Sequence, residues 1–349
     1  MKRLVALVIL VFTIVGCAVG LSYHRLYYPM TATLPGGSGV WEFESLPLNF
    51  WSSDVMPDGT TVIATVQEAG KGRVYKSVDE GLTWQFIFEI PESLGAGLTF
   101  CDSYGNIYVS APAQEFTGVA GLWRSADGGV TFQKVWEAEP AHRWGNIRFK
   151  GMCEVDGILY FGESVYSGGN CDVFRSTDQG VTWTKISTIS GGKHIHALQY
   201  NPYNGWFYAS VGDAGYSANG LWRSKDNCLT WEKFNLPDWT IMSVGFYNDY
   251  VFCNIHHEQG QIRRFRDTDG LSPSWEEVYR TGMTYQNWCQ LYQRSGKTFM
   301  LAGGENGDVG VWGSDTPPFN SGTWQKYWND SSGSGGTVAP SLKTSLNGW

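Results

Sequence analysis

The sequence predicts an all-β protein built from one repeated unit of about 48 residues. A Ser-x-Asp-x-Gly-x-Thr-aromatic pattern starts at Ser77, Ser125, Ser176 and Ser224, with spacings of 48, 51 and 48 residues. Beside each copy, aromatic and β-branched residues alternate with polar ones, as in half-buried strands. The chain also contains 44 Gly and 17 Trp, which suits β-structure with many tight turns. Such a period is typical of propeller blades or solenoid turns.

Each copy of the pattern is predicted to be a turn between two strands. Its Ser and Asp side chains can accept hydrogen bonds from nearby backbone N–H groups, and its Gly tolerates a positive φ. The final Trp or Phe is expected to pack between neighbouring sheets. Cys228 replaces the glycine in the fourth copy, so that turn is expected to be strained or differently shaped. We interpret the aspartates as structural and not catalytic: Asp79, Asp127, Asp178 and Asp226.

The repeated pattern resembles the Asp-box, or BNR repeat, of sialidase-like β-propellers. Two degraded copies follow, Asp267-Thr-Asp269-Gly270 before Trp275 and Ser314-Asp315 before Trp324, and they start 43 and 47 residues after the preceding copy. The resemblance implies a six-bladed β-propeller over residues 39–329. Each blade would be a four-stranded antiparallel sheet, with a box joining strands three and four.

The fourth repeat gives the clearest strand register. Its strands are expected at residues 196–200, 206–210, 220–223 and 230–234. Residues 41–47 resemble a further fourth strand, which gives seven outer-strand candidates for six inner sets. Either the N-terminal segment adds an outer strand, or one assignment is wrong. An added strand would cover an open sheet edge.

Successive strands of a blade run in opposite directions. The loops between strands two and three, and the connections between blades, are therefore expected on the face opposite the boxes. Rigid scaffolds often carry function on such loops. The loops contribute acids at Glu68, Glu115, Glu163, Asp213, Glu258 and Glu305. The connections contribute rings at Trp51, Trp144, His194, Trp239 and Trp288. Rings stack on sugar C–H groups and carboxylates accept hydroxyl hydrogen bonds, so we predict a glycan-binding face. The alternative is that the tryptophans are core and the acids are solvated.

A glycoside hydrolase is the main alternative function. It needs two carboxylates beside the scissile bond, and Glu163 and Asp213 are the first choice. His194 and His196 are interpreted as pointing to opposite faces. The chain lacks the Arg-Ile-Pro motif of sialidases, so typical sialidase activity is not expected. A protein-binding or self-assembling surface module is a third alternative, because the fold does not select the function.

No metal site and no cofactor are expected. His256-His257-Glu258 is interpreted as a surface or packing cluster, and the cysteines lack metal-ligand spacing. After Cys17, six cysteines remain, and their pairing stays open. The net charge of −8 and the absence of a long basic run argue against nucleic acid as a partner.

The ends of the chain are expected to lie outside the propeller. Residues 1–23 combine a basic start with an apolar stretch, so they predict an export signal, a membrane anchor or a lipobox ending at Cys17. All three place the propeller at the cell surface or outside the cell. Residues 24–38 are a predicted linker and 330–349 a flexible tail. The tail is a candidate for self-assembly with a neighbouring molecule.

Overall fold

The computed structural model describes the backbone of residues 10–11, 30–33, 40–43, 50–79, 81–91, 93, 97–111, 121–139, 147, 150–213, 215–256, 260–281, 283–294, 297–307, 310–329 and 337–338. Side chains are described within residues 52–281 of these ranges, apart from 166–168 and 269, and within 312–326.

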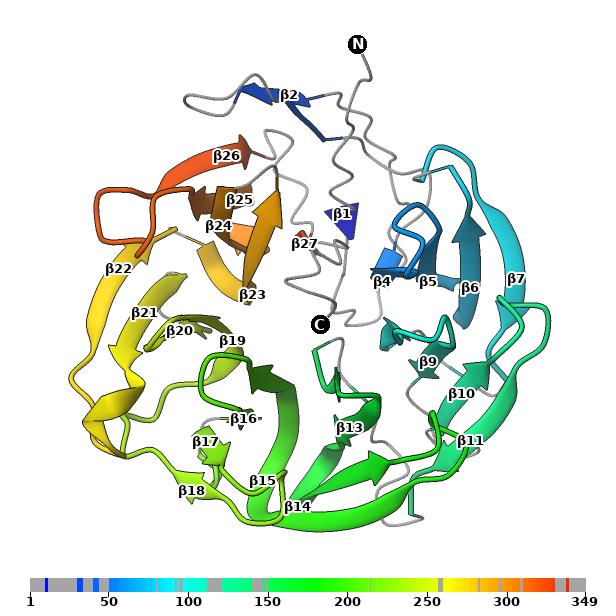
Figure 1. Ribbon diagram of the computed structural model, residues 1–349, viewed down its shortest axis with the longest axis horizontal. Helices are drawn as coiled ribbons and strands as arrows, with labels where there is room; N and C mark the ends of the chain where they lie inside the picture. The colour runs from blue at the N-terminus through cyan, green and yellow to red at the C-terminus, as the bar shows by residue number, and fades with distance from the viewer. Residues whose placement is uncertain are drawn as a thin grey trace.

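The described strands are antiparallel and form sheets arranged in a ring around a central axis, as Figure 1 shows. This is the arrangement of a β-propeller. The first sheet comprises β4 (Phe50–Val55), β5 (Val62–Glu68), β6 (Lys71–Ser77) and β7 (Gln85–Glu89). The second comprises β8 (Thr99–Cys101), β9 (Ile107–Ala111), β10 (Gly121–Ser125) and β11 (Gln133–Glu137).

A seven-stranded sheet follows in the ring. It comprises β12 (Met152–Val155), β13 (Ile158–Gly162), β14 (Ser164–Ser176), β15 (Thr184–Asn201), β16 (Trp206–Gly212), β17 (Gly220–Ser224) and β18 (Glu232–Lys233). The strand β15 is 18 residues long. Its first part pairs with β14, from Thr184 onward, and its second part pairs with β16, up to Asn201. One continuous strand therefore serves two consecutive parts of the ring.

Two four-stranded sheets complete the ring. The first comprises β19 (Ile241–Tyr247), β20 (Tyr250–Ile255), β21 (Gln261–Arg266) and β22 (Glu276–Arg280). The second comprises β23 (Met283–Arg294), β24 (Lys297–Gly307), β25 (Gly310–Ser314) and β26 (Gln325–Asn329). Two short pairs join β2 (Met30–Thr33) to β3 (Val40–Phe43), and β1 (Leu10–Val11) to β27 (Thr337–Val338).

Strand order follows chain order in each sheet of the ring. Short turns suffice for such antiparallel neighbours. The second strand β5 is buried on both faces along most of its length, whereas the outer strand β7 is partly exposed. The described backbone contains no α-helix, only the 3-10 turn η2 at Asp267–Asp269. In this part of the chain no helix is long and apolar enough to cross a membrane.

Aromatic side chains from the repeated motif pack between sheets. Phe132, which ends the second copy, stacks on Phe88 of β7 with ring centroids 4.4 Å apart. Trp183, which ends the third copy, packs on Phe161 at 4.7 Å. That cluster also contains Leu122 from the preceding sheet. Burial of Phe161 alone contributes roughly 1.5–3 kcal/mol. These contacts hold neighbouring sheets together.

The four motif turns share one set of hydrogen bonds. In the second, the backbone N–H of Thr131 donates to Asp127 Oδ1 at 2.9 Å, and its hydroxyl donates to Oδ2 at 2.6 Å. The N–H of Gly129 donates to Ser125 Oγ at 2.9 Å. Equivalent bonds hold the turns at Asp79, Asp178 and Asp226.

The fourth turn keeps this shape despite Cys228. Its N–H donates to Ser224 Oγ at 2.9 Å, and its φ of +66° lies in the region that glycine occupies in the other copies. Of the two expected outcomes, a strained turn or a turn of different shape, the structure shows the first. The expected strain is present, because a left-handed conformation is unfavourable for a residue with a Cβ. Within the described side chains, five cysteines are present as free thiols: Cys101, Cys153, Cys171, Cys228 and Cys253.

Candidate functional site

Four polar side chains converge where β15 leaves β14 and meets β16. Asp213 Oδ1 lies 3.4 Å from His196 Nε2, and Asp213 Oδ2 lies 3.5 Å from His194 Nε2. Lys193 Nζ donates to Asp213 Oδ2 at 2.9 Å. Both imidazoles are buried, but the Asp213 side chain is 41 % exposed. The carboxylate is therefore the member of this cluster most open to solvent.

The two histidine rings lie on the same side of β15. Their centroids are 5.5 Å apart with an interplanar angle of 29°. The interpretation that they point to opposite faces is wrong, because residues two apart on a strand share a face. The register shift between Ile195 and Ala197 is a local irregularity in the pairing with β16. Both rings can therefore meet the carboxylate of Asp213.

Gly212 leaves the space in which the His196 ring lies. A Cβ on this glycine would come within 2.1 Å of His196 Cε1 and 2.9 Å of both ring nitrogens. Any other residue at this position would therefore displace the ring. The glycine ends β16 directly before Asp213, so the same short segment positions both partners.

The second nitrogen of each ring, Nδ1, has its own partner. His196 Nδ1 lies 3.1 Å from the carbonyl oxygen of Ile241, and His194 Nδ1 lies 2.8 Å from Ser164 Oγ. A carbonyl oxygen can only accept, so His196 Nδ1 carries the hydrogen. Hydrogen bonds from His194 and His196, which donate through Nε2 when the rings are protonated, and from Lys193 hold the pKa of Asp213 well below its usual range. Asp213 is therefore an anion at neutral pH.

An exposed aromatic ring lies near the Lys193 ammonium group that contacts this carboxylate. Tyr216 is 36 % exposed, and its N–H donates to the backbone oxygen of Asp213 at 3.3 Å. Lys193 Nζ lies 5.9 Å from the centre of its ring. Sequence reasoning singled out neither Lys193 nor Tyr216. The same rule that selected acids in the second-to-third-strand loops, applied to aromatic residues, would have found Tyr216.

Glu163, the other carboxylate of the predicted hydrolase pair, is only 1 % exposed. Its carbonyl accepts the N–H of Ile195 at 3.2 Å. Burial, with Glu163 and Asp172 nearby, raises the pKa of the Cys171 thiol to about 12. Glu163 thus lies in a buried environment near Cys171, whereas Asp213 faces solvent.

Two other residues of the predicted glycan-binding face contact partners outside the Asp213 cluster. Glu68 accepts a hydrogen bond from the Tyr75 hydroxyl at 2.8 Å and pairs with Arg73 at 2.9 Å. Trp239 is buried, and the Arg263 guanidinium lies 4.3 Å from its ring centre. One face of the Trp239 ring is therefore covered.

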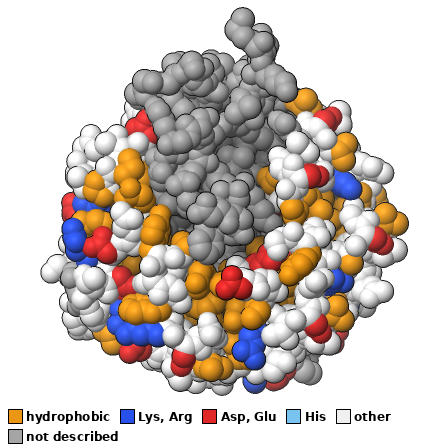
Figure 2. Space-filling model, in the orientation of Figure 1, with side chains coloured by type: hydrophobic (Ala, Val, Ile, Leu, Met, Phe, Trp, Pro, Cys, Tyr) orange, Lys and Arg blue, Asp and Glu red, His pale blue; other side chains and the backbone are white. Residues whose placement is uncertain are grey.

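The remaining predicted residues lack a described side chain. Trp51, Trp288 and Glu305 lie in β4, β23 and β24, at positions where only the backbone is described. Glu115, Trp144 and Glu258 lie outside the described residues. Figure 2 shows acidic and basic side chains of the described part interspersed around the rim of the ring. This view shows no continuous basic patch of the kind that binds nucleic acid on the described part of the rim.

The sequence is similar to two curated xyloglucanases. It is 27 % identical over 218 residues to one from Paenibacillus sp., a match covering 51 % of this chain and 20 % of the relative. It is 24 % identical over 255 residues to one from Hypocrea jecorina, covering 60 % and 30 %. The chain therefore spans less than a third of the length of either. No protein-family model matches it.

Solved structures share the fold. A GH74 enzyme from Niastella koreensis has a TM-score of 0.54 at 14 % identity, over 80 % of this chain and 46 % of its own. YCF48 from Cyanidioschyzon merolae has a TM-score of 0.52 at 15 % identity, over 80 % and 86 %. At these identities only the fold is shared: the chain is a β-propeller of a type that glycoside hydrolases use. The relatives agree with the expectation that any enzymatic activity is that of a glycoside hydrolase.

Proposed function

We propose that this chain is a six-bladed Asp-box β-propeller that binds a glycan on the face opposite its Ser-x-Asp turns. The main supporting observation is the partly exposed carboxylate of Asp213, which contacts Lys193, His194 and His196. The exposed ring of Tyr216 lies near Lys193. A carboxylate held in place accepts charge-assisted hydrogen bonds from sugar hydroxyls without losing rotamer freedom on binding. The tyrosine ring offers a flat apolar surface for a sugar face.

Six blades follow if β15 is divided between two of them. The part of β15 that pairs with β14 would be the fourth strand of the third blade. The part that pairs with β16 would be the first strand of the fourth blade. The recurrent Ser, Asp and Thr hydrogen bonds of the four motif turns support the Asp-box interpretation.

The test is binding of the full chain to xyloglucan oligosaccharides, the substrate class that the names of the two relatives suggest. We expect Asp213→Asn and Tyr216→Ala each to weaken binding by about tenfold or more, equivalent to about 1.4 kcal/mol. Tyr203→Ala is the matched control, because Tyr203 is also exposed but lies in the turn at the other end of the same sheet. Equal effects at both tyrosines, or no binding to any glycan, would reject the proposal and favour a protein partner.

Glycoside hydrolysis on the same face is the second candidate. Asp213 is favoured as a nucleophile or as a charge that stabilises the transition state, because its neighbours keep it ionised, whereas a general acid must hold a proton. Glu163 remains the proposed second carboxylate, and it would have to become accessible. The measurement is release of reducing sugar ends from xyloglucan. A hydrolase loses this release in Asp213→Asn and in Glu163→Gln, whereas a binding module shows none in the parent chain.

A further inference from the structure

We propose that His194, His196 and Asp213 form a binding site for one divalent transition-metal ion of the zinc type. This goes beyond the proposed glycan binding and does not depend on it. Each residue offers one ligand atom, and the three atoms lie within 4.8 Å of one another. Two imidazoles and one carboxylate match the donor set of open zinc sites, in which water or substrate takes the fourth position.

The spacing of the ligand atoms fits a single small ion. Ligands at 2.0–2.1 Å from a tetrahedral zinc ion are about 3.4 Å from one another. The His196 Nε2–Asp213 Oδ1 distance is 3.4 Å and the His194 Nε2–Asp213 Oδ2 distance is 3.5 Å. An ion could therefore enter with only small side-chain movements.

The hydrogen-bond pattern supports the same inference. Because Ile241 O accepts from His196 Nδ1, the neutral His196 ring presents its Nε2 lone pair toward Asp213 Oδ1. A lone pair and a carboxylate oxygen at that distance repel each other unless a cation lies between them or the ring gains a proton. In metal-binding histidines, the nitrogen that does not bind the metal usually forms a hydrogen bond that orients the ring. Ile241 O and Ser164 Oγ occupy these positions here.

The site is held in place but remains accessible. The His196 ring lies against the bare backbone of Gly212, and both imidazoles are buried. Asp213 is exposed enough to provide an entry route and an open coordination position. Lys193 opposes metal binding, because its ammonium group lies 2.9 Å from Asp213 Oδ2 and repels a second cation. The ion would therefore compete with Lys193 for the carboxylate of Asp213.

The test is titration of the full chain with ZnCl₂ by calorimetry, without glycan, together with the absorption spectrum of the Co²⁺-loaded chain. We expect about one ion per chain and cobalt bands of four- or five-coordinate geometry. His196→Ala and Asp213→Asn should each weaken zinc binding by at least about tenfold. His256→Ala is the matched control and should leave it unchanged. Lys193→Ala should tighten binding by removing the competing charge.

Three results would overturn the proposal. The first is the absence of stoichiometric zinc binding by the parent chain. The second is equal zinc affinity in the His196 and His256 variants, and the third is weaker binding in Lys193→Ala. If His196→Ala fails to fold, Asp213→Asn and the imidazole nitrogen signals of the cobalt-loaded parent chain decide the question. Because no glycan is present, failure here is distinct from failure of the proposed function.

Discussion

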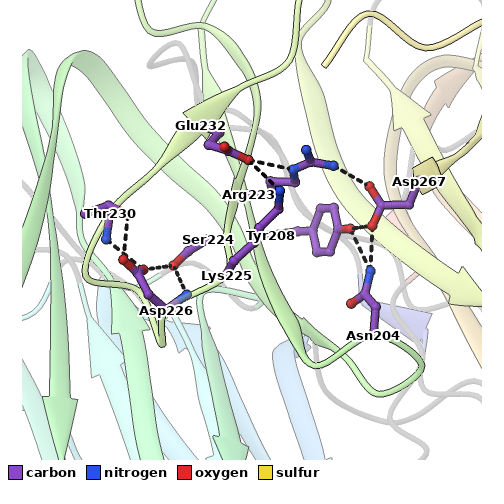
Figure 3. A network of polar contacts seen from close by, with 9 residues as sticks. All are labelled: Asn204, Tyr208, Arg223, Ser224, Lys225, Asp226, Thr230, Glu232 and Asp267. Carbon is purple, nitrogen blue, oxygen red and sulfur yellow. Dashed lines mark hydrogen bonds and ion pairs between the residues drawn. The ribbon is translucent and has the colours of Figure 1, made fainter. Parts of the chain in front are cut away.

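Arg223 on β17 and Asp267 in the turn after β21 form a buried ion pair of 3.0 Å, with side-chain exposures of 6 % and 5 %. Figure 3 shows Tyr208 and Asn204 pointing at the same carboxylate, and both donate hydrogen bonds to it. Arg223 also pairs with Glu232 at 3.0 Å. This network joins the seven-stranded sheet to the next sheet of the ring.

Comparable contacts recur at other sheet boundaries. In each, a cationic side chain on a third strand reaches the motif turn, or its degraded equivalent, of the following sheet. The donor and acceptor atoms are Lys76 Nζ and Gly128 O (2.9 Å), Arg124 Nε and Gln179 O (2.7 Å), and Arg264 Nη1 and Pro318 O (2.7 Å). The motif turns therefore also link successive sheets through hydrogen bonds.

Loss of the buried ion pair should destabilise the protein strongly. Asp267→Ala leaves Arg223 buried without this partner, and we expect it to lower the free energy of unfolding by about 3–5 kcal/mol. Arg266→Ala is the control, because its ion pair with Asp249 is exposed and is expected to contribute about 0–1 kcal/mol. Urea denaturation measures both. Similar losses in the two variants would contradict a special role for the buried pair.

The glycine of the third motif turn is predicted to be irreplaceable. A Cβ at Gly180 would meet Tyr108 Cε1 at 2.4 Å, and the φ of this residue is +75°. Gly180→Ala should therefore add a steric clash to backbone strain, for a loss of about 2–5 kcal/mol. Gly59→Ala, at a φ of +76° with no atom within 4 Å, should show the strain alone, about 1–2 kcal/mol. Thermal denaturation of the two variants compares them, and equal losses would disprove the clash.

The motif aspartates should make the thermal stability of the protein depend on pH in the acidic range. Hydrogen bonds from Thr83 and Ser77 lower the pKa of Asp79 to about 2 in the folded chain, below the ordinary value of about 3.9. The resulting stabilisation is present above pH 4 and is lost as the pH falls toward 2. Asp79→Asn should therefore lower Tm at pH 6 and have little effect near pH 2. An equal difference in Tm at both pH values would argue against the linkage.

Gly212→Ala should disturb the histidine cluster specifically. The new Cβ would displace the His196 ring, so we expect zinc affinity to fall by at least about tenfold. Gly215→Ala is the nearby control, because its φ of +87° brings strain but no atom lies within 4 Å of a new Cβ. Calorimetric zinc titration compares the two. Retained zinc affinity in Gly212→Ala would mean that the position of the ring does not matter for the metal.

Local features of this fold were accessible from the sequence, whereas contacts between distant segments were not. The strands expected at residues 206–210 and 220–223 lie within β16 and β17, because alternation and turn chemistry are local signals. The continuity of β15 was missed, since no sequence signal distinguishes one bent strand from two. The burial of Glu163 and the contact of His196 with Ile241 depend on contacts between segments that are distant in the sequence, which motif spacing does not encode.

The length of β15 limits how this ring can be rearranged by recombination. A gene segment that ended within residues 184–201 would divide one hydrogen-bonded strand between two fragments. The two halves of the seven-stranded sheet are thus expected to be inherited, duplicated or lost together. For the same reason, an engineered circular permutant should tolerate new ends at exposed turns such as that of Tyr203, and should not tolerate them near Lys193.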